Sequence, residues 1–281
     1  MAPRHPRAYR QTSQQDFTVF YHEIMCCPTK RTLLQAIKDG YFSTWPGLTE
    51  KLISKYLPEQ QITEKGHLYQ QKQLPAAAAL ASVTPLYTKK GENTSEVLLQ
   101  LFDPTENTYS DLTGQFPVQS DRGNNYILVS YHCKENNILT TPLKNRTGPW
   151  ILSVITKICE KLRKLTPKIH IMDNEVSEDL KKYFEYSDIR FQLMPPHMYW
   201  RNAAERSVRT FKNHFIAALC TVDPLSPFYV WDRLLPQVTM TLNMLRQYRL
   251  NPGISAYEQV DGIHNFEGTP LSTLGLQDID N

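Results

Sequence analysis

The stretch NTYSDLTGQFPVQSDRGNNYILVSYHCKENNILTTPLKNRTGPWILSVITKICEKLRKLTPKIHIMD (107–173) decides the fold of this chain. It opens with three short runs that are rich in β-branched and aromatic residues, NTYSDLTGQF (107–116), NYILVSYHC (125–133) and NILTTPL (137–143). The gaps between these runs suit hairpin turns, so we expect three antiparallel strands. The stretch ends on KIHIMD (168–173), which is short and apolar enough for a buried strand.

Helices are expected to alternate with the later strands. Over 149–165 the apolar residues recur at steps of three and four, which predicts a helix. Further along, we expect a helix at 177–186, a strand at 189–194, a long helix over roughly 202–221 and a helical segment at 227–250 that bends near Pro236. This order resembles that of the α/β, RNase H-like fold: a mixed five-stranded sheet, in which three antiparallel strands are followed by parallel additions, flanked by helices.

Apolar spacing also predicts a small helical module near the N-terminus. It indicates two short helices within 29–57, the first ending at Gly40 and the second before Pro58. Basic, Gln-rich residues before them predict a loose tail, and a later segment rich in Ala, Pro and charge predicts a linker. The expected units are a tail (1–16), the helical N-terminal module (17–70), a linker (71–100), the α/β core (101–222), its helical extension (223–269) and a second tail (270–281).

Composition and charge narrow the class of protein. The 281 residues are 41% hydrophobic, which is ample for a packed core, and the formal net charge is +3. Basic side chains gather at 157–168, at 201–212 and in the first ten residues. Any one such cluster is ordinarily a solvated helix face. Three clusters beside candidate catalytic carboxylates favour a phosphate backbone as the partner.

The cysteines and the apolar segments indicate where in the cell the protein is expected. The chain has five cysteines, an odd number, and no CxxC pair, so we expect a reducing compartment and no disulfide framework. The N-terminus carries no apolar signal segment, and no run approaches the ~18 apolar residues of a membrane span. We therefore expect a soluble, intracellular protein that has no membrane partner.

Three acidic residues occupy positions that suit two-metal phosphodiester chemistry. Asp111 lies inside the first expected strand, where aspartate is uncommon. Asp173 ends an apolar strand, and Glu205 lies in the first turn of the long helix. Hard divalent cations prefer carboxylate oxygens that are held on rigid elements. Each acid also has a structural explanation, since Asp173 could begin a turn and Glu205 could interact with the helix dipole. The combination of all three is the stronger signal.

The long helix carries two parallel rows of side chains. An apolar row predicts its buried face and consists of Ala204, Val208, Phe211, Phe215 and Leu219. Glu205, Arg209 and Lys212 form a second row beside it. A surface ion pair, worth only ~0.3–0.5 kcal/mol, explains this second row structurally. The functional explanation is that the acid binds metal while the two basic residues hold DNA phosphates.

Several segments resemble the catalytic cores of retrotransposon integrases. The likeness runs from about 107 to 269, and it is most specific in PPHMYWRNAAERSVRTFKNHFIAALC (195–220) and WDRLLPQVTMTLNMLR (231–246). It also includes SDLTGQFPVQSDRGNNYILVSYH (110–132), PLKNR (142–146) and IMDNE (171–175). Upstream, residues 21–48 are similar to the region that precedes the core in retrotransposon polyproteins.

The resemblance implies a two-metal polynucleotidyl transferase and endonuclease that processes the DNA ends of a transposable element and joins them to a target duplex. The family's Asp, Asp, Glu pattern falls on Asp111, Asp173 and Glu205, which would bind Mg²⁺ or Mn²⁺. Basic residues four and seven positions after the family's Glu match Arg209 and Lys212. We add Arg201 and Asn202 to these nucleic-acid-binding residues. The family works as multimers on DNA, so the resemblance also implies a homo-oligomer and a nuclear integration step.

The sequence departs from the family at three places. The family's N-terminal zinc module uses two His and two Cys with a CxxC pair, whereas only His22 and the adjacent Cys26 and Cys27 remain here. We therefore expect no zinc site, and we expect His22 to be an ordinary surface residue. Tyr199 and Trp200 precede the long helix, where they could stack on a base, although packing is the favoured interpretation. The sequence ends at Asn281, soon after the core, which suggests a fragment, a degenerate copy or a captured gene.

Two other functions stay open at this stage. One is a catalytically silent, integrase-derived protein for nucleic-acid binding or assembly, which would lack a divalent metal site. The other is a stand-alone RNase H-type nuclease, which shares the fold but would cleave RNA–DNA hybrids.

Overall fold

A computed structural model of the chain describes residues 13–67, 107–162, 169–172, 177–193, 201–222 and 226–274. The expected linker (71–100) lies outside the described residues, as do Asp173, Tyr199 and Trp200. The side chains of Arg201 and Asn202 are likewise outside the description.

The described strands form one sheet with five members. They are β1 (Asn107–Leu112), β2 (Tyr126–His132), β3 (Asn137–Leu143), β4 (Ile169–Met172) and β5 (Arg190–Leu193), in the spatial order β3-β2-β1-β4-β5. β2 pairs antiparallel with both β1 and β3, whereas β4 pairs parallel with β1 and with β5. The predicted RNase H-like sheet, three antiparallel strands followed by parallel additions, is confirmed.

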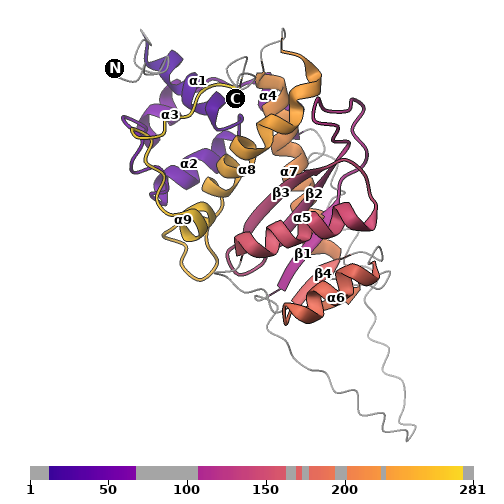
Figure 1. The fold of residues 1–281 in the computed structure, drawn as a ribbon. Helices are drawn as coiled ribbons and strands as arrows, with labels where there is room; N and C mark the ends of the chain where they lie inside the picture. Colours follow the sequence, from indigo (N-terminus) through magenta and orange to yellow (C-terminus); the bar gives the residue numbers. More distant parts are fainter. Residues whose placement is uncertain are drawn as a thin grey trace, which may run out of the picture.

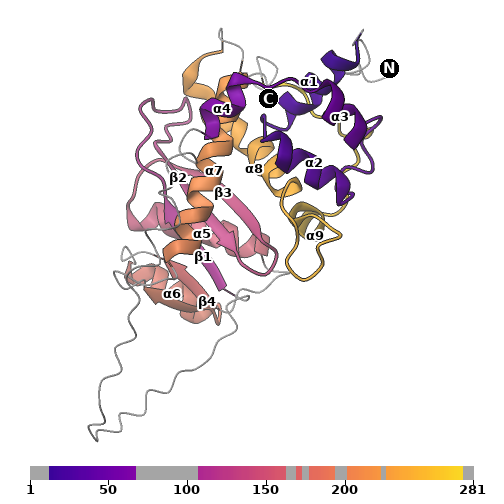
Figure 2. The same ribbon diagram turned by 180° about the vertical axis from the view of Figure 1, so that it is seen from behind.

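Helices cover both faces of this sheet. α5 (Gly148–Lys161) and α6 (Glu178–Tyr186) lie on one face, where Leu128 of β2 shares a buried cluster with Ile155 and Phe184 (Figure 1). α7 (Arg201–Thr221) crosses the other face, where Tyr109 of β1 shares a cluster with Phe211 (Figure 2). Since successive side chains of a strand point to opposite faces, odd-numbered residues of β1 lie toward α7 and even-numbered residues toward α5.

The segment after α7 folds back over the α7 face. It forms the 3₁₀ helix η6 (Phe228–Leu234) and then α8 (Leu235–Met244), rather than the single bent helix expected over 227–250. Pro236 stands in the first turn of α8, where proline is tolerated because that N–H would have no intrahelical partner. Trp231 of η6 is buried and stacks on Phe116, with ring centroids 4.2 Å apart.

The N-terminal module contains four described helices, α1 (Gln14–Ile24), α2 (Lys30–Lys38), α3 (Glu50–Tyr56) and α4 (Gln61–His67). The two helices predicted within 29–57 are confirmed as α2 and α3. The expectation of a loose tail over 1–16 is wrong for its last residues, because α1 begins at Gln14. The Ser13 hydroxyl caps this helix by accepting from the backbone N–H of Asp16, and Phe20 and Ile24 bury its inner face.

The N-terminal module and the C-terminal extension share one buried cluster. Trp45 packs there with Phe266, which follows α9 (Ala256–Asp261), and with Met244 and Leu245 at the end of α8. The hydroxyl of Thr44 donates to the carbonyl of His264 at 2.7 Å. Figure 1 shows α2, α8 and α9 grouped at one side of the sheet. Within the described residues, no helix combines the length and the apolar character that crossing a membrane requires.

Candidate active site

Asp111 is the fifth of the six residues of β1 and pairs with Val129 of β2. Strand alternation places it on the same face as Tyr109, which packs in one cluster with Val208 and Phe211 of α7. The side chain is half-buried, and its Oδ1 accepts the backbone N–H of Leu112 at 2.8 Å. A carboxylate therefore lies on the face of the sheet that α7 covers.

Glu205 lies near the start of α7 and is exposed. Arg209 and Lys212, four and seven residues later, are also exposed. On the adjacent side of the helix, Val208, Phe211 and Phe215 are buried. The two predicted rows of α7 are thus confirmed for the residues whose side chains are described, with Leu219 half-buried at the edge of the core.

The predicted second acid, Asp173, directly follows the last residue of β4 and lies outside the described residues. The strand that leads to it belongs to the sheet, where Met172 pairs in parallel with Ser110, the residue before Asp111. Two of the three acid-bearing elements are therefore adjacent, because Asp111 of β1 is on the face of the sheet that α7 covers. Among the described residues, no group of three or more His, Cys, Asp or Glu side chains is arranged to hold a metal ion.

The opposite face of β1 holds a buried polar network. Ser110 Oγ lies 2.5 Å from Ser130 Oγ and 2.9 Å from Nε2 of His170. Nearby, the His132 ring lies between Thr108 and Glu135, at 2.8 Å and 2.6 Å. Burial, with a smaller contribution from His132, lowers the pKa of His170 to about 4, so its ring is neutral at pH 7. These titratable groups are on the α5 side of the sheet, away from Asp111.

The histidine and cysteines at the end of α1 are part of the N-terminal core. His22 is only 2% exposed, so the expectation of an ordinary surface residue is wrong. Its ring nitrogens lie 3.1 Å from Gln60 Oε1 and 2.7 Å from the carbonyl of Pro28, which provide the polar partners that a buried ring needs. Burial lowers the pKa of His22 and raises the pKa of the Cys26 thiol to about 12, with opposing hydrogen bonds as smaller effects. The thiol of Cys26 therefore stays protonated at neutral pH.

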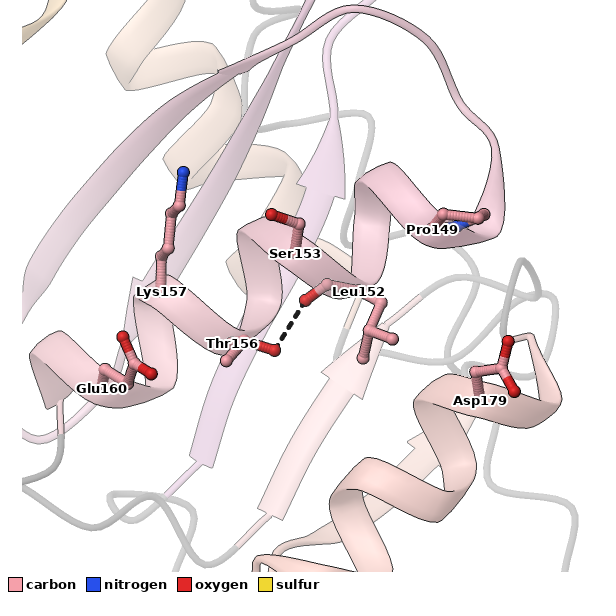
Figure 3. A pocket seen from close by; sticks show the side chains of 7 residues that line it. All are labelled: Pro149, Leu152, Ser153, Thr156, Lys157, Glu160 and Asp179. Carbon is pink, nitrogen blue, oxygen red and sulfur yellow. Dashed lines mark hydrogen bonds between the residues drawn. The ribbon is translucent and has the colours of Figure 1, made fainter.

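A hollow of about 480 Å³ lies between α5 and α6. Figure 3 shows the side chain of Leu152 on α5 extending toward α6, where Asp179 lies in the first turn, while the hydroxyl of Thr156 donates to the carbonyl of Leu152. Because α5 and α6 cover the face of the sheet away from Asp111, this hollow is separate from the candidate carboxylates. The basic cluster predicted at 157–168 is partly structural, since Lys161 lies 3.9 Å from the carboxylate of Asp261.

Two basic residues were not assigned to a site from the sequence. Lys144 and Arg146 occupy the turn between β3 and α5, and each lies over an aromatic ring, of Trp150 and of Tyr126 respectively. The sequence pattern could have predicted them as nucleic-acid-binding residues. A basic pair, Lys144 and Arg146, lies between an expected strand and an expected helix and is followed by the aromatic Trp150.

Solved structures of retroviral integrases are similar to part of this chain. The catalytic core domain of BIV integrase matches over 56% of this chain and 93% of its own, at 15% identity and a TM-score of 0.42. The HTLV-2 integrase catalytic core domain, in complex with magnesium and in a trimeric form, matches over 57% and 97%, at 17% identity and a TM-score of 0.43. A simian T-cell lymphotropic virus intasome in complex with PP2A regulatory subunit B56 gamma matches over 56% of this chain and 55% of its own, at 17% identity and a TM-score of 0.46.

No protein-family model and no curated protein matches the chain.

Proposed function

We propose that this chain is an integrase-like polynucleotidyl transferase that binds DNA, processes the 3′ ends of an element and joins them to a target duplex. Asp111, Asp173 and Glu205 would be its catalytic carboxylates. The observation that carries the proposal is the position of Asp111 on the face of the sheet that α7 covers. The exposed Glu205 lies on that same helix, and β4 runs parallel to β1 up to the residue before Asp173.

The donor set fits a hard divalent cation. Asp111 and Glu205 offer carboxylate oxygens on a strand and on a helix, and both elements are anchored in the core. Mg²⁺ and Mn²⁺ prefer such ligands. When bound, these ions would stabilise the developing charge on the attacking and leaving oxygens of phosphodiester exchange.

The chain's own residues orient the DNA. Arg209 and Lys212 follow Glu205 along one exposed row of α7, so phosphates bound there would place the adjoining bond beside the carboxylate. Arg201 and Asn202, in the first turn of the same helix, would extend this contact toward its N-terminus.

Strand transfer by carboxylate variants tests the proposal. Asp111→Asn, Asp173→Asn and Glu205→Gln should each lower Mg²⁺-dependent joining of a processed DNA end to a duplex by about 100-fold or more, because each removes a metal ligand. Binding to DNA in EDTA should stay within a few-fold of wild type. Asp179→Asn, which removes an exposed acid on the far face, is the matched control and should retain activity.

Two outcomes would reject the proposal. Wild-type protein that binds DNA but shows neither joining nor a Mg²⁺ or Mn²⁺ site by calorimetry would instead be a silent, integrase-derived binding protein. Metal-dependent cleavage of RNA–DNA hybrids without DNA joining would indicate an RNase H-type nuclease.

We also propose that the protein self-associates on DNA and acts in the nucleus, where target DNA is found. Joining two element ends to one target needs two active sites held together. Light scattering after mixing with element-end duplexes should therefore show a complex with more than one copy of the chain. A strictly monomeric complex that still joins paired ends would contradict this part.

A further inference from the structure

The turn between β3 and α5 lies at the same end of the sheet as the candidate carboxylates. β1 and β4 are parallel, and β2 is antiparallel to both β1 and β3. The carboxyl ends of β1, β3 and β4 therefore lie at one end of the sheet, with the amino end of β2. Leu143, the last residue of β3, pairs with Tyr126, so Lys144 and Arg146 leave the sheet at this end.

The same turn leads directly into a contact with the start of α6. A Cβ added to Gly148 would lie 2.9 Å from the Cβ of Ser177. Ser177 is the N-cap of α6, four residues after Asp173. The start of α5 and the start of α6 are thus in contact, so the basic turn lies close to the N-cap of α6.

Both cations of the turn are exposed and held against aromatic rings. Lys144 Nζ lies 5.3 Å from the ring centroid of Trp150, and the Arg146 guanidinium carbon lies 5.1 Å from that of Tyr126. These contacts restrict the side chains without neutralising their charge. Asn145 Oδ1 accepts from both the N–H and the hydroxyl of Thr147, which fixes the turn between them.

Among the described residues, no carboxylate pairs with the positive charge of this turn. Within the part of the chain that the structure describes, neither Lys144 nor Arg146 is within ion-pair distance of an acid, whereas Lys161, Lys181 and Arg233 are. Two exposed cations two residues apart, with no carboxylate partner in the described part of the chain, suit the repeating charge of a nucleic-acid backbone.

We infer that Lys144 and Arg146, supported by Trp150 and Tyr126, form a phosphate-binding subsite for the backbone of the DNA duplex that flanks the reacting bond. The inference rests on the proposed function, because it identifies the ligand as the duplex on which the candidate carboxylates act. A duplex fits better than a mobile anion, because its phosphates are fixed in a row that can contact the turn and the end of the sheet at once. The row Arg209 and Lys212 belongs to α7, on the other face, so the turn would be a separate contact.

Salt-dependent DNA binding tests this subsite. We would measure the anisotropy of a fluorescent DNA duplex with the full chain in EDTA, between ~50 and ~200 mM salt. The double variant Lys144→Gln/Arg146→Gln should bind several-fold more weakly whatever the base sequence. In a plot of the logarithm of the DNA association constant against the logarithm of the salt concentration, the negative slope should become shallower by about 1 to 2. Each lost phosphate contact contributes ~0.9 to this slope.

A matched control is available on α3. Lys55 also lies over an aromatic ring, with Nζ 4.8 Å from the Tyr56 centroid, but it belongs to the N-terminal module. Lys55→Gln should leave the slope unchanged. An unchanged slope in a double variant that melts like wild type would overturn the inference, as would an equal loss with Lys55→Gln. A loss of binding confined to single-stranded DNA would also overturn it, because the duplex would not be the ligand.

Failure of the inference can be told apart from failure of the proposed function. Binding in EDTA needs no chemistry, so an inactive wild-type protein can still show the predicted change in slope. Conversely, Asp111→Asn should abolish strand transfer while keeping the wild-type slope. If wild-type protein joined DNA but the double variant kept the wild-type salt dependence of binding, the proposed function would stand and only the subsite would be rejected.

Discussion

At the scale of single residues, the two faces of β1 have different chemistry. Asp111, toward α7, is half-buried, whereas Ser110, toward α5, is buried against Ser130 and His170. A neutral histidine can be buried here because Ser110 provides one hydrogen bond and the ring of Phe184 lies 5.2 Å away. Protonation would place a charge in an apolar surrounding, which is why the pKa of His170 is low.

The buried His170 makes stability depend on pH. Its pKa falls from 6.5 to about 4 on folding, so between these values the unfolded chain binds a proton that the folded chain does not. Stability should therefore fall as the pH drops through 6.5 and level off near 4, by up to roughly 1.4 kcal/mol per pH unit. His170→Gln removes the titrating group and should flatten this dependence in urea unfolding. The pKa of His22 is also lowered, so some slope should remain. Parallel pH profiles of the variant and wild type would contradict the assignment.

The candidate carboxylates could be found from local sequence because their signals are local. Asp111 is unusual inside a strand, and the row Glu205, Arg209 and Lys212 follows from helical spacing alone. The burial of His22 could not be found in this way. Its partner Gln60 lies 38 positions away, and local periodicity does not report which side chains meet across such a separation.

At the scale of elements, segments with a clear apolar period were predictable, including the short helices α2 and α3, whereas α4 and α9 were not. The five strands and α5, α6 and α7 all agree with the sequence patterns. The helices α4 and α9 span fewer than two full turns, as α3 also does. Unlike α3, which has three large apolar residues, QITEKGH (61–67) has one and AYEQVD (256–261) has two, too few for an apolar period to be detected. Helices this short are marginal alone, so tertiary packing decides whether they form. For α4 that packing is against α7.

Gly66 sets the distance between α4 and α7. A Cβ at this position would lie 2.7 Å from Ala217 Cβ and 2.9 Å from the carbonyl oxygen of Asn213. Gly66→Leu should therefore displace α4 and lower the free energy of unfolding by about 1–3 kcal/mol. Leucine has a higher helix propensity than glycine, so propensity alone would predict that the variant is more stable than wild type. Hydrogen exchange should show faster exchange in α4.

Gly114→Ala is the control for this steric effect. A Cβ at Gly114 has nothing within 4 Å, so the variant should unfold like wild type. If Gly66→Leu kept both the wild-type stability and the protection of α4, the close approach of the two helices would not matter to the fold.

At the scale of the whole molecule, the two ends of the chain share one hydrophobic core, although they are far apart in the sequence. Helices from the first quarter of the chain and residues after α8 bury their apolar faces together, and the sheet has its own clusters. The hydroxyl of Tyr41 donates to the carbonyl of Pro252, and Gln237 Nε2 donates to that of Ile24. Sequence patterns predicted an N-terminal module and a C-terminal extension as separate units. They could not reveal that each completes the core of the other, because amphipathic faces do not specify their partners.

Trp45 is the residue that should reveal this mutual dependence. It is 4% exposed, and its ring centroid lies 4.5 Å from that of Phe266 and 5.4 Å from that of Tyr21. Trp45→Ala should lower the free energy of unfolding by about 3–5 kcal/mol, through lost burial and the cavity that remains. Because Phe266 would lose its partner, hydrogen exchange should accelerate over 256–266 as well as in the N-terminal helices. Phe228→Ala, which truncates an aromatic ring that is 61% exposed, should change neither. Loss of protection restricted to residues 13–67 would show that the C-terminal segment is stable without the N-terminal helices, and the shared core would then have no energetic role.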